Sequence, residues 1–340
     1  MDRKNRITLL LPGLALLLTA CSGSAADTTT TTVVAATTTA VPSSIATPSS
    51  STVAPVTTTA ATTTAIPVPL LDLSFLDLPF IPQGLGHYEG WLIIDGAPVS
   101  TGKFNANLPA TNFADVNGDG IGPFPLDFDP YDATAFVLTI EAAGDTDAIP
   151  SDTHLLAGDI AEGVAELTIN HGAALGIDFA SAGGEFVLAT PTDGDRTNDE
   201  YSGVWFLTFP GPVPGLDLPE LPAGWTYEGW TVIDGLPVTT GTFLRVNASD
   251  DAAPYSGSVR TPNFPGEDYL RNAPAGLTFP TDLSGATVFI TIEPAGDGNP
   301  LPFDLRLLAG PIPAAAELEP VSYPLTNEGF VAPTGTATLG

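Results

Sequence analysis

The sequence has few of the residues on which most enzymes and nucleic-acid-binding proteins depend. It has one cysteine, three histidines, and nine lysines plus arginines against 39 aspartates plus glutamates, for a formal net charge of −30. An acidic chain without a basic patch gains nothing from contact with a phosphate backbone, so nucleic acid is excluded as a partner. A single cysteine forms no intrachain disulfide, and no Gly-x-Ser-x-Gly elbow, P-loop or dinucleotide-binding fingerprint is present. We therefore expect no enzyme activity and assign no catalytic residue.

The sequence also lacks the composition of long amphipathic helices. Lys4 and Lys103 are its two lysines, and charged residues make up 14% of the chain. Helices need charged residues on their wet faces and few helix breakers, whereas this chain has 35 glycines and 34 prolines. Short strands joined by many tight turns fit this composition, so the sequence predicts an all-β protein.

Residues 1–20 have the pattern of a bacterial lipoprotein signal peptide. Three basic residues precede an apolar stretch of 12 residues, 7–18, which is shorter than the roughly 20 residues of a transmembrane helix. Leu18-Thr19-Ala20-Cys21 follows and resembles a lipobox, in which the cysteine after the cleavage site accepts a diacylglyceryl group. We expect acyl chains on Cys21 to hold the protein to membrane lipid outside the cytoplasm, because each buried CH2 group contributes about 0.8 kcal/mol.

Residues 21–69 are predicted to form a disordered stalk. Thr, Ala, Ser, Val and Pro dominate this segment, which has several threonine runs and no aromatic residue. Such a composition buries too little apolar surface to offset the entropy of ordering the chain. A flexible chain of this length has a mean reach of roughly 35 to 40 Å, enough to hold a folded head away from the lipid surface.

Two blocks of sequence occur twice in the remaining chain. Tyr88-Glu89-Gly90-Trp91 returns as Tyr227-Glu228-Gly229-Trp230, at an offset of 139 residues. Thr139-Ile140-Glu141 returns as Thr291-Ile292-Glu293, at an offset of 152 residues. Internal repeats of this kind indicate two copies of one structural unit, with an insertion of 13 residues between the blocks of the second copy.

The two copies are predicted to be β modules at residues 70–210 and 211–340. Apolar and small or polar residues alternate along 135–140, which is the period of a half-buried strand. Asp95-Gly96 and Asp234-Gly235 are the dipeptides that favour type I′ hairpin turns. The predicted fold is therefore two tandem β-sandwich-like domains that follow a disordered Thr/Ala/Pro-rich stalk.

The repeated residues carry a resemblance to a known family. Trp-x-x-x-Asp-Gly-x-Pro-Val-x-x-Gly-x-Phe begins at Trp91 and again at Trp230, and Thr-Ile-Glu-Pro-Ala-Gly-Asp stands at 291–297. These motifs resemble the extracytoplasmic C-terminal domain of anti-sigma-K factors. The resemblance implies a β-sandwich-like domain on the outer side of a membrane protein whose cytosolic end holds a sigma factor inactive. This sequence has no sigma-binding helical segment, so the resemblance implies the fold and the location and leaves regulation to a separate membrane partner.

Two functions remain open from the sequence. The leading hypothesis is a non-enzymatic lipoprotein that acts in envelope sensing or regulation through a membrane regulatory protein. The alternative is a surface protein for adhesion or for binding an envelope glycan, with tryptophans as a stacking platform. Trp91 and Trp230 are expected to fill the two module cores because they occupy equivalent positions, and Trp225 is the candidate for an exposed ring.

One loop has the beginning of a calcium site. Asp115, Asn117 and Asp119 alternate before a glycine, and Asp127 follows close behind, although Leu126 stands where an EF-hand loop has its last ligand. The alternative is an acidic β-turn, and turn chemistry is also the expected reason for the other acidic clusters, at 145–152, 193–199 and 297–304.

The histidines lack the spacing of a zinc site. At the repeat offset His87 matches Thr226, so a catalytic histidine shared by both modules is not expected.

Overall fold

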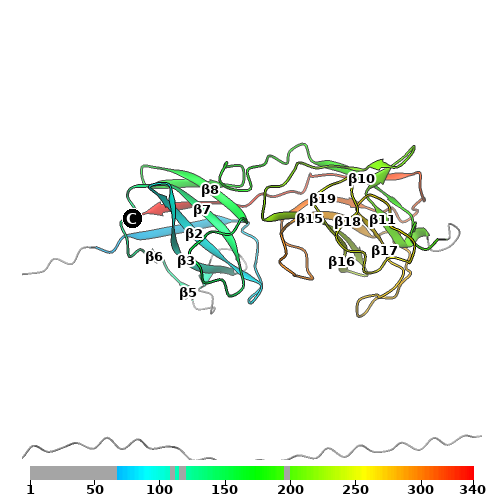
Figure 1. Ribbon diagram of the computed structural model, residues 1–340, viewed down its shortest axis with the longest axis horizontal. Coiled ribbons are helices and arrows are strands. Elements are labelled where there is room, and N and C mark those ends of the chain that lie inside the picture. Colours follow the sequence, from blue (N-terminus) through cyan, green and yellow to red (C-terminus); the bar gives the residue numbers. More distant parts are fainter. Residues whose placement is uncertain (1–66, 108–111, 115–119, 195–199) are drawn as a thin grey trace, which may run out of the picture. The chain divides into compact units, whose positions relative to one another are not determined.

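A computed structural model describes residues 67–107, 112–114, 120–194 and 200–340. Strands dominate these residues and all their pairings are antiparallel, while the single helical element in the described ranges is a short 3-10 turn at Glu200–Ser202 (Figure 1). The prediction of an all-β protein is confirmed. The predicted signal peptide, nearly all of the predicted stalk and Cys21 lie outside the described residues.

The largest sheet has ten strands in the order β5-β4-β3-β2-β7-β8-β9-β21-β1-β6, and we call it the first lobe. Its strands are β1 (Leu70–Leu76), β2 (Gly86–Ile94), β3 (Ala97–Asn107), β4 (Asn112–Ala114), β5 (Gly120–Ile121), β6 (Phe124–Pro125), β7 (Ala133–Ala142), β8 (His154–Ala161), β9 (Val164–Thr168) and β21 (Thr334–Leu339). Phe104 on β3 lies 6.1 Å from Phe75 on β1 and 5.4 Å from Phe124 on β6, measured between ring centroids. The sheet therefore curls until strands near its two ends share one core.

The other strands form three sheets, which together we call the second lobe. A four-stranded sheet has the order β16-β15-β18-β19; a five-stranded sheet has the order β14-β10-β11-β17, with β20 also paired to β10; and β12 pairs with β13. The strands are β10 (Gly183–Leu188), β11 (Gly203–Trp205), β12 (Leu207–Thr208), β13 (Val213–Pro214), β14 (Leu216–Asp217), β15 (Trp225–Ile233), β16 (Leu236–Phe243), β17 (Gly266–Asp268), β18 (Thr287–Pro294), β19 (Arg306–Pro311) and β20 (Ser322–Leu325). Phe206, next to β11, packs against Phe243 on β16 with ring centroids 6.3 Å apart, so side chains from the two larger sheets meet in a common core.

The sequence repeat is also a structural repeat. Tyr88 pairs with Phe104 across β2 and β3, and Tyr227 pairs with Phe243 across β15 and β16. The register shifts directly after Gly90 in the first lobe, and it shifts at the equivalent place in the second. Strands β2, β3, β7 and β8 thus have their counterparts in β15, β16, β18 and β19.

The hairpin turns are of the expected type. Asp95 and Gly96 have φ angles of 52° and 77°, and Asp234 and Gly235 have φ angles of 51° and 82°. Positive φ at both central residues is the requirement of a type I′ turn, whose twist matches that of the flanking strands.

The strand pairings cross the boundary that the sequence analysis places between residues 210 and 211. Strand β21 pairs with β1 and β9 of the first lobe, next to the blue strand in Figure 1. Strands β10 and β11, which precede the boundary, pair with β20 and β17 of the second lobe. The repeated motifs cover the hairpins and β7, β8 and their copies, so they carry no information on the partners of the remaining strands.

Candidate functional site

Five equivalent positions form a polar cluster where β2, β3 and the end of β7 meet in the first lobe, and where their copies meet in the second; we call each cluster the recess of its lobe, after the cavity that the second one lines. In the first lobe the five are His87, Glu89, Lys103, Glu141 and Asp145, and in the second they are Thr226, Glu228, Thr242, Glu293 and Asp297. Four of the five positions come together through strand pairing, because their residues lie directly opposite one another on neighbouring strands. The opposed pairs are Glu89 with Lys103, His87 with Glu141, Glu228 with Thr242 and Thr226 with Glu293.

A hydrogen-bonded chain supports the recess of the first lobe from beneath. The indole N–H of Trp91 donates to Thr139 Oγ1 at 2.9 Å, and the Thr139 hydroxyl donates to Glu141. The Glu141 carboxylate also accepts from the backbone N–H of Ser151, with its two oxygens 3.0 and 3.2 Å from the nitrogen. Thr139 and Glu141 are almost completely buried, so each bond satisfies a polar group that water does not reach.

The second lobe repeats this chain residue by residue. Trp230 donates to Thr291 Oγ1 at 2.9 Å, and the Thr291 hydroxyl donates to Glu293. Glu293 accepts from the backbone N–H of Phe303, at 2.9 and 3.1 Å. Glu141 and Glu293 thus tie the loop after β7 and the loop after β18 to their sheets, which is a structural role.

A lysine ammonium stands at the centre of the first recess. Lys103 Nζ lies 3.4 Å from Glu89 Oε2 and donates to Asp145 at two points, the carboxylate Oδ2 at 2.9 Å and the carbonyl oxygen at 2.7 Å. Ser100 donates its hydroxyl to the other oxygen of Glu89. The ammonium therefore balances two carboxylates, one of them buried.

The pKa values of these groups follow from burial and from the lysine. Burial raises the pKa of Glu89, and the Ser100 hydrogen bond and the charge of Lys103 oppose this shift. Burial also acts to lower the pKa of Lys103, but its hydrogen bond to Asp145 and the charge of Glu89 outweigh burial, so the pKa is raised. The Lys103 hydrogen bond lowers the pKa of Asp145. Lys103 and Asp145 are thus held in their charged forms.

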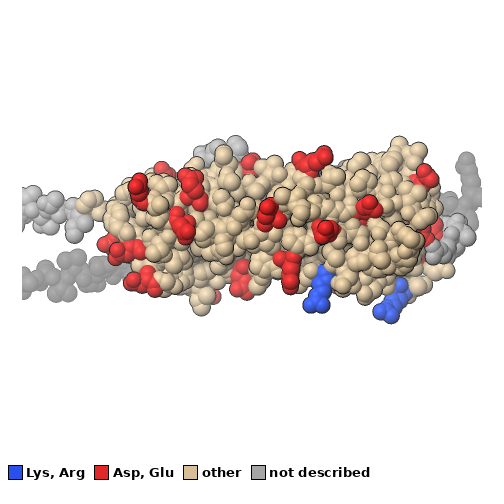
Figure 2. Space-filling model, turned by 90° about the horizontal axis from the view of Figure 1, so that it is seen from above, with Lys and Arg blue, Asp and Glu red and all other residues tan. Residues whose placement is uncertain are grey.

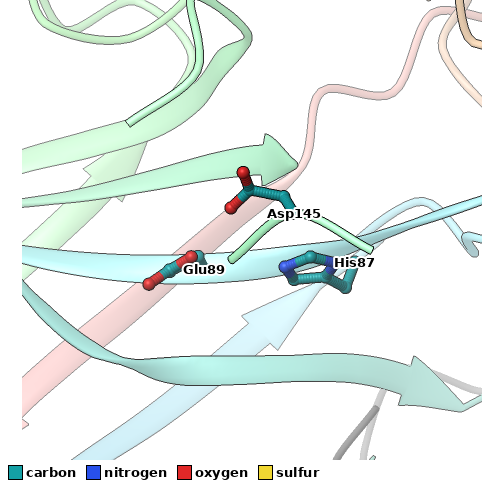
Figure 3. A group of neighbouring side chains, drawn as sticks. All are labelled: His87, Glu89 and Asp145. Carbon is teal, nitrogen blue, oxygen red and sulfur yellow. The ribbon is translucent and has the colours of Figure 1, made fainter. Parts of the chain in front are cut away.

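The same recess contains the three side chains best placed to hold a metal ion. Ligand atoms of His87, Glu89 and Asp145 lie within 4.8 Å of one another, and this is the single such group in the described ranges (Figure 3). His87 is 5% exposed, its Nε2 has no hydrogen-bond partner, and burial followed by the charge of Lys103 lowers its pKa. A neutral imidazole suits a metal, but the ammonium of Lys103 lies against both carboxylates and competes with any cation there.

The second recess has the same acids without the lysine. Thr242 stands at the place of Lys103. Among the described residues there is no ion pair to any of the three acids Glu228, Glu293 and Asp297. These side chains line a recess of about 450 Å³.

The carboxyl groups of the second recess hold their protons more tightly than isolated ones. Burial, and then the charge of Asp297, raise the pKa of Glu228 to about 7. Burial raises the pKa of Glu293 to about 8, with a contribution from the charge of Glu228, and burial also raises the pKa of Asp297. Desolvation and like charges both disfavour the charged form of these acids, and a cation bound here would favour it.

The predicted calcium residues are only partly within the described structure. Asp127 is exposed in the bend after β6, while Asp115, Asn117 and Asp119 lie outside the described residues, so the calcium site stays a prediction. In two other acidic clusters the side chains cap turns, as expected: Asp147 accepts from the N–H of Ile149, at 2.8 Å. Asp297 likewise accepts from the backbone two residues ahead, at 3.0 Å.

The four tryptophans are all buried, which corrects the expectation for Trp225. Its side chain is 2% exposed because β15 begins at Trp225, which places it on the same face as Tyr227 and against Phe303 in the main core. Trp91 and Trp230 are buried as expected, at 1% exposure each, although both lie outside the main core. Trp91 packs in a small cluster with Val137, Ala157 and Ala174.

Sequence reasoning missed the recess, although the signal was present. Glu89 and Glu141 belong to the two repeated motifs, and the repeat of Ala143-Gly144-Asp145 includes a third acid. Each motif was interpreted as a strand or a turn, and the exchange of Lys103 for Thr242 lies between the positions that match. Only strand pairing shows that these positions surround one point.

Comparisons with protein-family models, with curated protein sequences and with solved structures found no match to this chain. The resemblance to the anti-sigma-K factor domain therefore stays a prediction. In the part of the chain that the structure describes, no helix has the length and hydropathy needed to cross a bilayer. The function is argued from the residues themselves.

Proposed function

We propose that this protein is a non-enzymatic, extracytoplasmic lipoprotein that acts in envelope sensing or regulation through a membrane partner. The order of basic residues, apolar segment and Leu18-Thr19-Ala20-Cys21 supports lipid attachment at Cys21. The Thr-rich segment at 21–69 provides the length to hold the folded lobes away from the lipid.

The observation that supports a binding role most strongly is that the polar groups repeated in both lobes make the same hydrogen bonds. Glu141 and Glu293, equivalent buried acids of the two recesses, are each engaged with a threonine hydroxyl and a backbone N–H. Carboxylates held in this way stabilise loops. The duplicated recess then resembles a rigid frame that presents a polar surface to a ligand.

The partner is better described as a protein than as a glycan. Sugar-binding platforms use exposed aromatic rings, and all four indole rings are buried here. Acidic side chains are spread over the face shown in Figure 2, where basic ones are few, which favours a partner with a basic surface. An adhesion or carbohydrate-binding protein remains the alternative function, and the second experiment below distinguishes the two.

The lipid anchor is tested by replacing Cys21. The wild-type chain is expected to take up a radiolabelled fatty acid and to sediment with membranes after a high-salt wash. The Cys21→Ser variant is expected to do neither. Ser22→Ala, one residue further on, is the control that leaves the thiol in place. Unlabelled wild-type protein in the cytosol would overturn the proposal.

The partner is tested by cross-linking intact cells and purifying the protein from detergent-solubilised membranes. Recovery of a transmembrane regulatory protein in the cross-linked complex supports the proposed function. Retention of the protein by isolated envelope glycans, with no cross-linked protein, supports the alternative and contradicts regulation through a membrane partner.

A further inference from the structure

The first lobe shows what its recess binds, because the bound group is one of its own side chains. The ammonium of Lys103 reaches Glu89 from the neighbouring strand at 3.4 Å and Asp145 from the loop after β7 at 2.9 Å. The carbonyl oxygen of Asp145 accepts a further hydrogen bond from it at 2.7 Å. A buried acid, a partly exposed acid and a backbone carbonyl thus form a site for a primary ammonium group, which has three donors and no acceptor.

The second lobe keeps the acids of this site and lacks the lysine. Glu228 is the counterpart of Glu89 in the repeated register of β15 and β16. Asp297 is the counterpart of Asp145 in the sequence repeat, and each lies in the loop after its strand, β18 or β7. Thr242 replaces Lys103, and its hydroxyl donates to Asp251 at 3.2 Å, which adds another acid to the lining of the recess. A threonine is too short to place a cation between Glu228 and Asp297, so the countercharge of the first lobe has no equivalent in the described chain.

The second recess has room and apolar walls for an alkylammonium chain. Its volume is about 450 Å³, and apolar side chains of Trp225, Leu244 and Pro294 line it beside the acids. Methylene groups pack on apolar walls while the charged end reaches polar partners, as they do for lysine side chains in general.

The spacing of the acids argues against a metal ion at this place. Calcium takes six to eight oxygen ligands at about 2.3 to 2.6 Å, so its ligands have to converge closely. Among the described residues, three potential ligand atoms lie within 4.8 Å of one another only at His87, Glu89 and Asp145 of the first lobe. Charge-assisted hydrogen bonds to an ammonium are longer, at about 2.7 to 2.9 Å, and tolerate the wider arrangement.

We propose that the recess of the second lobe binds the primary ammonium group of a ligand between Glu228 and Asp297, as the first lobe binds its own Lys103. The ligand is an alkylamine in chemical terms, supplied by a free amine or by a lysine side chain of another protein. This inference goes beyond the proposed function and is independent of the lipid anchor, since it concerns the folded lobes alone.

Calorimetric titration of the full chain with n-butylamine tests the inference, with n-butanol as the uncharged ligand of similar size. One equivalent of butylamine is expected to bind, and butanol is not. Thr242→Lys installs the lysine of the first lobe and should weaken butylamine binding by at least about tenfold, because the added ammonium occupies the site. Thr242→Ser, which keeps a short hydroxyl side chain, should bind as the wild type does.

Two further variants keep the test decisive if Thr242→Lys folds poorly. Glu228→Gln removes one carboxylate charge and should weaken binding about tenfold, the loss of one charge-assisted contact. Lys103→Thr should create a second butylamine site in the first lobe, so the stoichiometry rises from one to two. Equal binding of butylamine by the wild type and by both the Thr242→Lys and Glu228→Gln variants would overturn the inference, as would equal binding of butanol.

The source of the ammonium is distinguished by two larger ligands. Cadaverine represents free amines, and Nα-acetyl-lysine methylamide represents a lysine side chain on a peptide backbone. Tighter binding of cadaverine assigns the site to free amines, and tighter binding of the lysine derivative assigns it to a protein partner. Binding of calcium with no binding of any amine contradicts the inference, and loss of membrane attachment in Cys21→Ser leaves it unaffected.

Discussion

Lys103 and Thr242 occupy the same place in the two lobes, each directly opposite the glutamate of a Tyr-Glu-Gly-Trp strand. Lys103 neutralises its glutamate from 3.4 Å, whereas Thr242 leaves the charge of the glutamate opposite it unbalanced. Duplication therefore produced two copies of one frame that differ at the position that decides the charge of the recess. Each copy serves as a control for experiments on the other.

Removal of Lys103 is expected to turn the first recess into a metal site. In the Lys103→Thr variant His87, Glu89 and Asp145 keep ligand atoms within 4.8 Å of one another, and the competing ammonium is gone. Ni²⁺ at 100 times its dissociation constant should then raise the free energy of unfolding of the untagged variant by about 2.7 kcal/mol, which is measured as a rise in melting temperature.

The wild-type chain, in which Lys103 holds both carboxylates, should show a much smaller shift with Ni²⁺. Adding His87→Ala to the Lys103→Thr variant should abolish the shift, because the imidazole is the strongest ligand of the three for this metal. A shift of the same size in the wild type and in Lys103→Thr would show that Ni²⁺ binds elsewhere.

The buried threonines of the repeat are expected to matter equally in both lobes. Thr139→Val leaves the indole N–H of Trp91 without a partner and removes one of the two hydrogen-bond donors to Glu141, and this should lower the free energy of unfolding by about 1 to 3 kcal/mol. Thr291→Val should have a similar effect in the second lobe. Urea denaturation of the purified proteins measures both.

Thr168→Val is the matched control, because Thr168 is exposed at the end of β9. Its effect should remain within about 0.5 kcal/mol. A cycle that combines Thr139→Val with Trp91→Phe should be non-additive, since each change breaks the same bond. Additive effects would mean that the bond between Trp91 and Thr139 contributes nothing to stability.

The sequence was sufficient for the parts of the fold that are local. Asp95-Gly96 predicts its turn because only certain residues tolerate positive φ at both central positions. Alternation along 135–140 predicts β7 as a strand, although the structure buries both of its faces there instead of one. The partners of β21 could not be predicted in this way. They lie far along the chain, and nothing in the composition of residues 334–339 specifies β1 and β9 as neighbours.

The recess shows the same division between local and distant information. The repeat marks Glu89, Glu141 and Asp145 as conserved between copies, but each is compatible with a strand end or a turn. Their meeting depends on the pairing of β2 with both β3 and β7, which is set by tertiary packing. Trp225 was misplaced for a related reason, because its counterpart in the first copy is Gly86, which gives no indication of which face a side chain takes.

A charge in β21 is expected to destabilise the first lobe. Ala337 is 2% exposed within the main core and pairs with Leu73 of β1 and Ala165 of β9. Ala337→Asp buries an unpaired carboxylate and should lower the free energy of unfolding by more than about 3 kcal/mol. Thr334→Asp, at an exposed position of the same strand, should change it by less than about 1 kcal/mol. Equal effects of the two variants in urea denaturation would contradict the burial of β21.

The second lobe is expected to lose stability as the pH rises from about 5 to 8. Glu267 and Asp268 on β17 are completely buried, and burial raises their pKa values to about 7 and about 6. Burial raises the pKa of Asp250, close by, to about 8. The charged groups that act on these three are themselves acidic: Asp251 and Glu267 on Asp250, Asp268 on Glu267, and Asp193 on Asp268.

The sign follows from proton uptake. In the unfolded chain these carboxyls release their protons near pH 4, whereas in the folded lobe they keep them to pH 6 to 8, so the folded state binds more protons in between. Stability is therefore highest below the unfolded pKa values and falls as the pH rises through the folded ones. Glu228 and Glu293 titrate in the same direction over the same range.

Asp250→Asn tests this expectation without disturbing the buried pair on β17. Asparagine keeps an acceptor for the backbone N–H of Gly266, which Asp250 binds at 2.9 Å, and removes the charge that forms at high pH. The wild-type melting temperature should be higher at pH 5 than at pH 8. The variant should show a smaller difference between the two, because its melting temperature should exceed that of the wild type mainly at pH 8. Asp217→Asn, at an exposed position of β14 that does not act on these acids, should leave the difference close to that of the wild type. A melting temperature that rises from pH 5 to pH 8 would contradict the retention of protons by these buried acids.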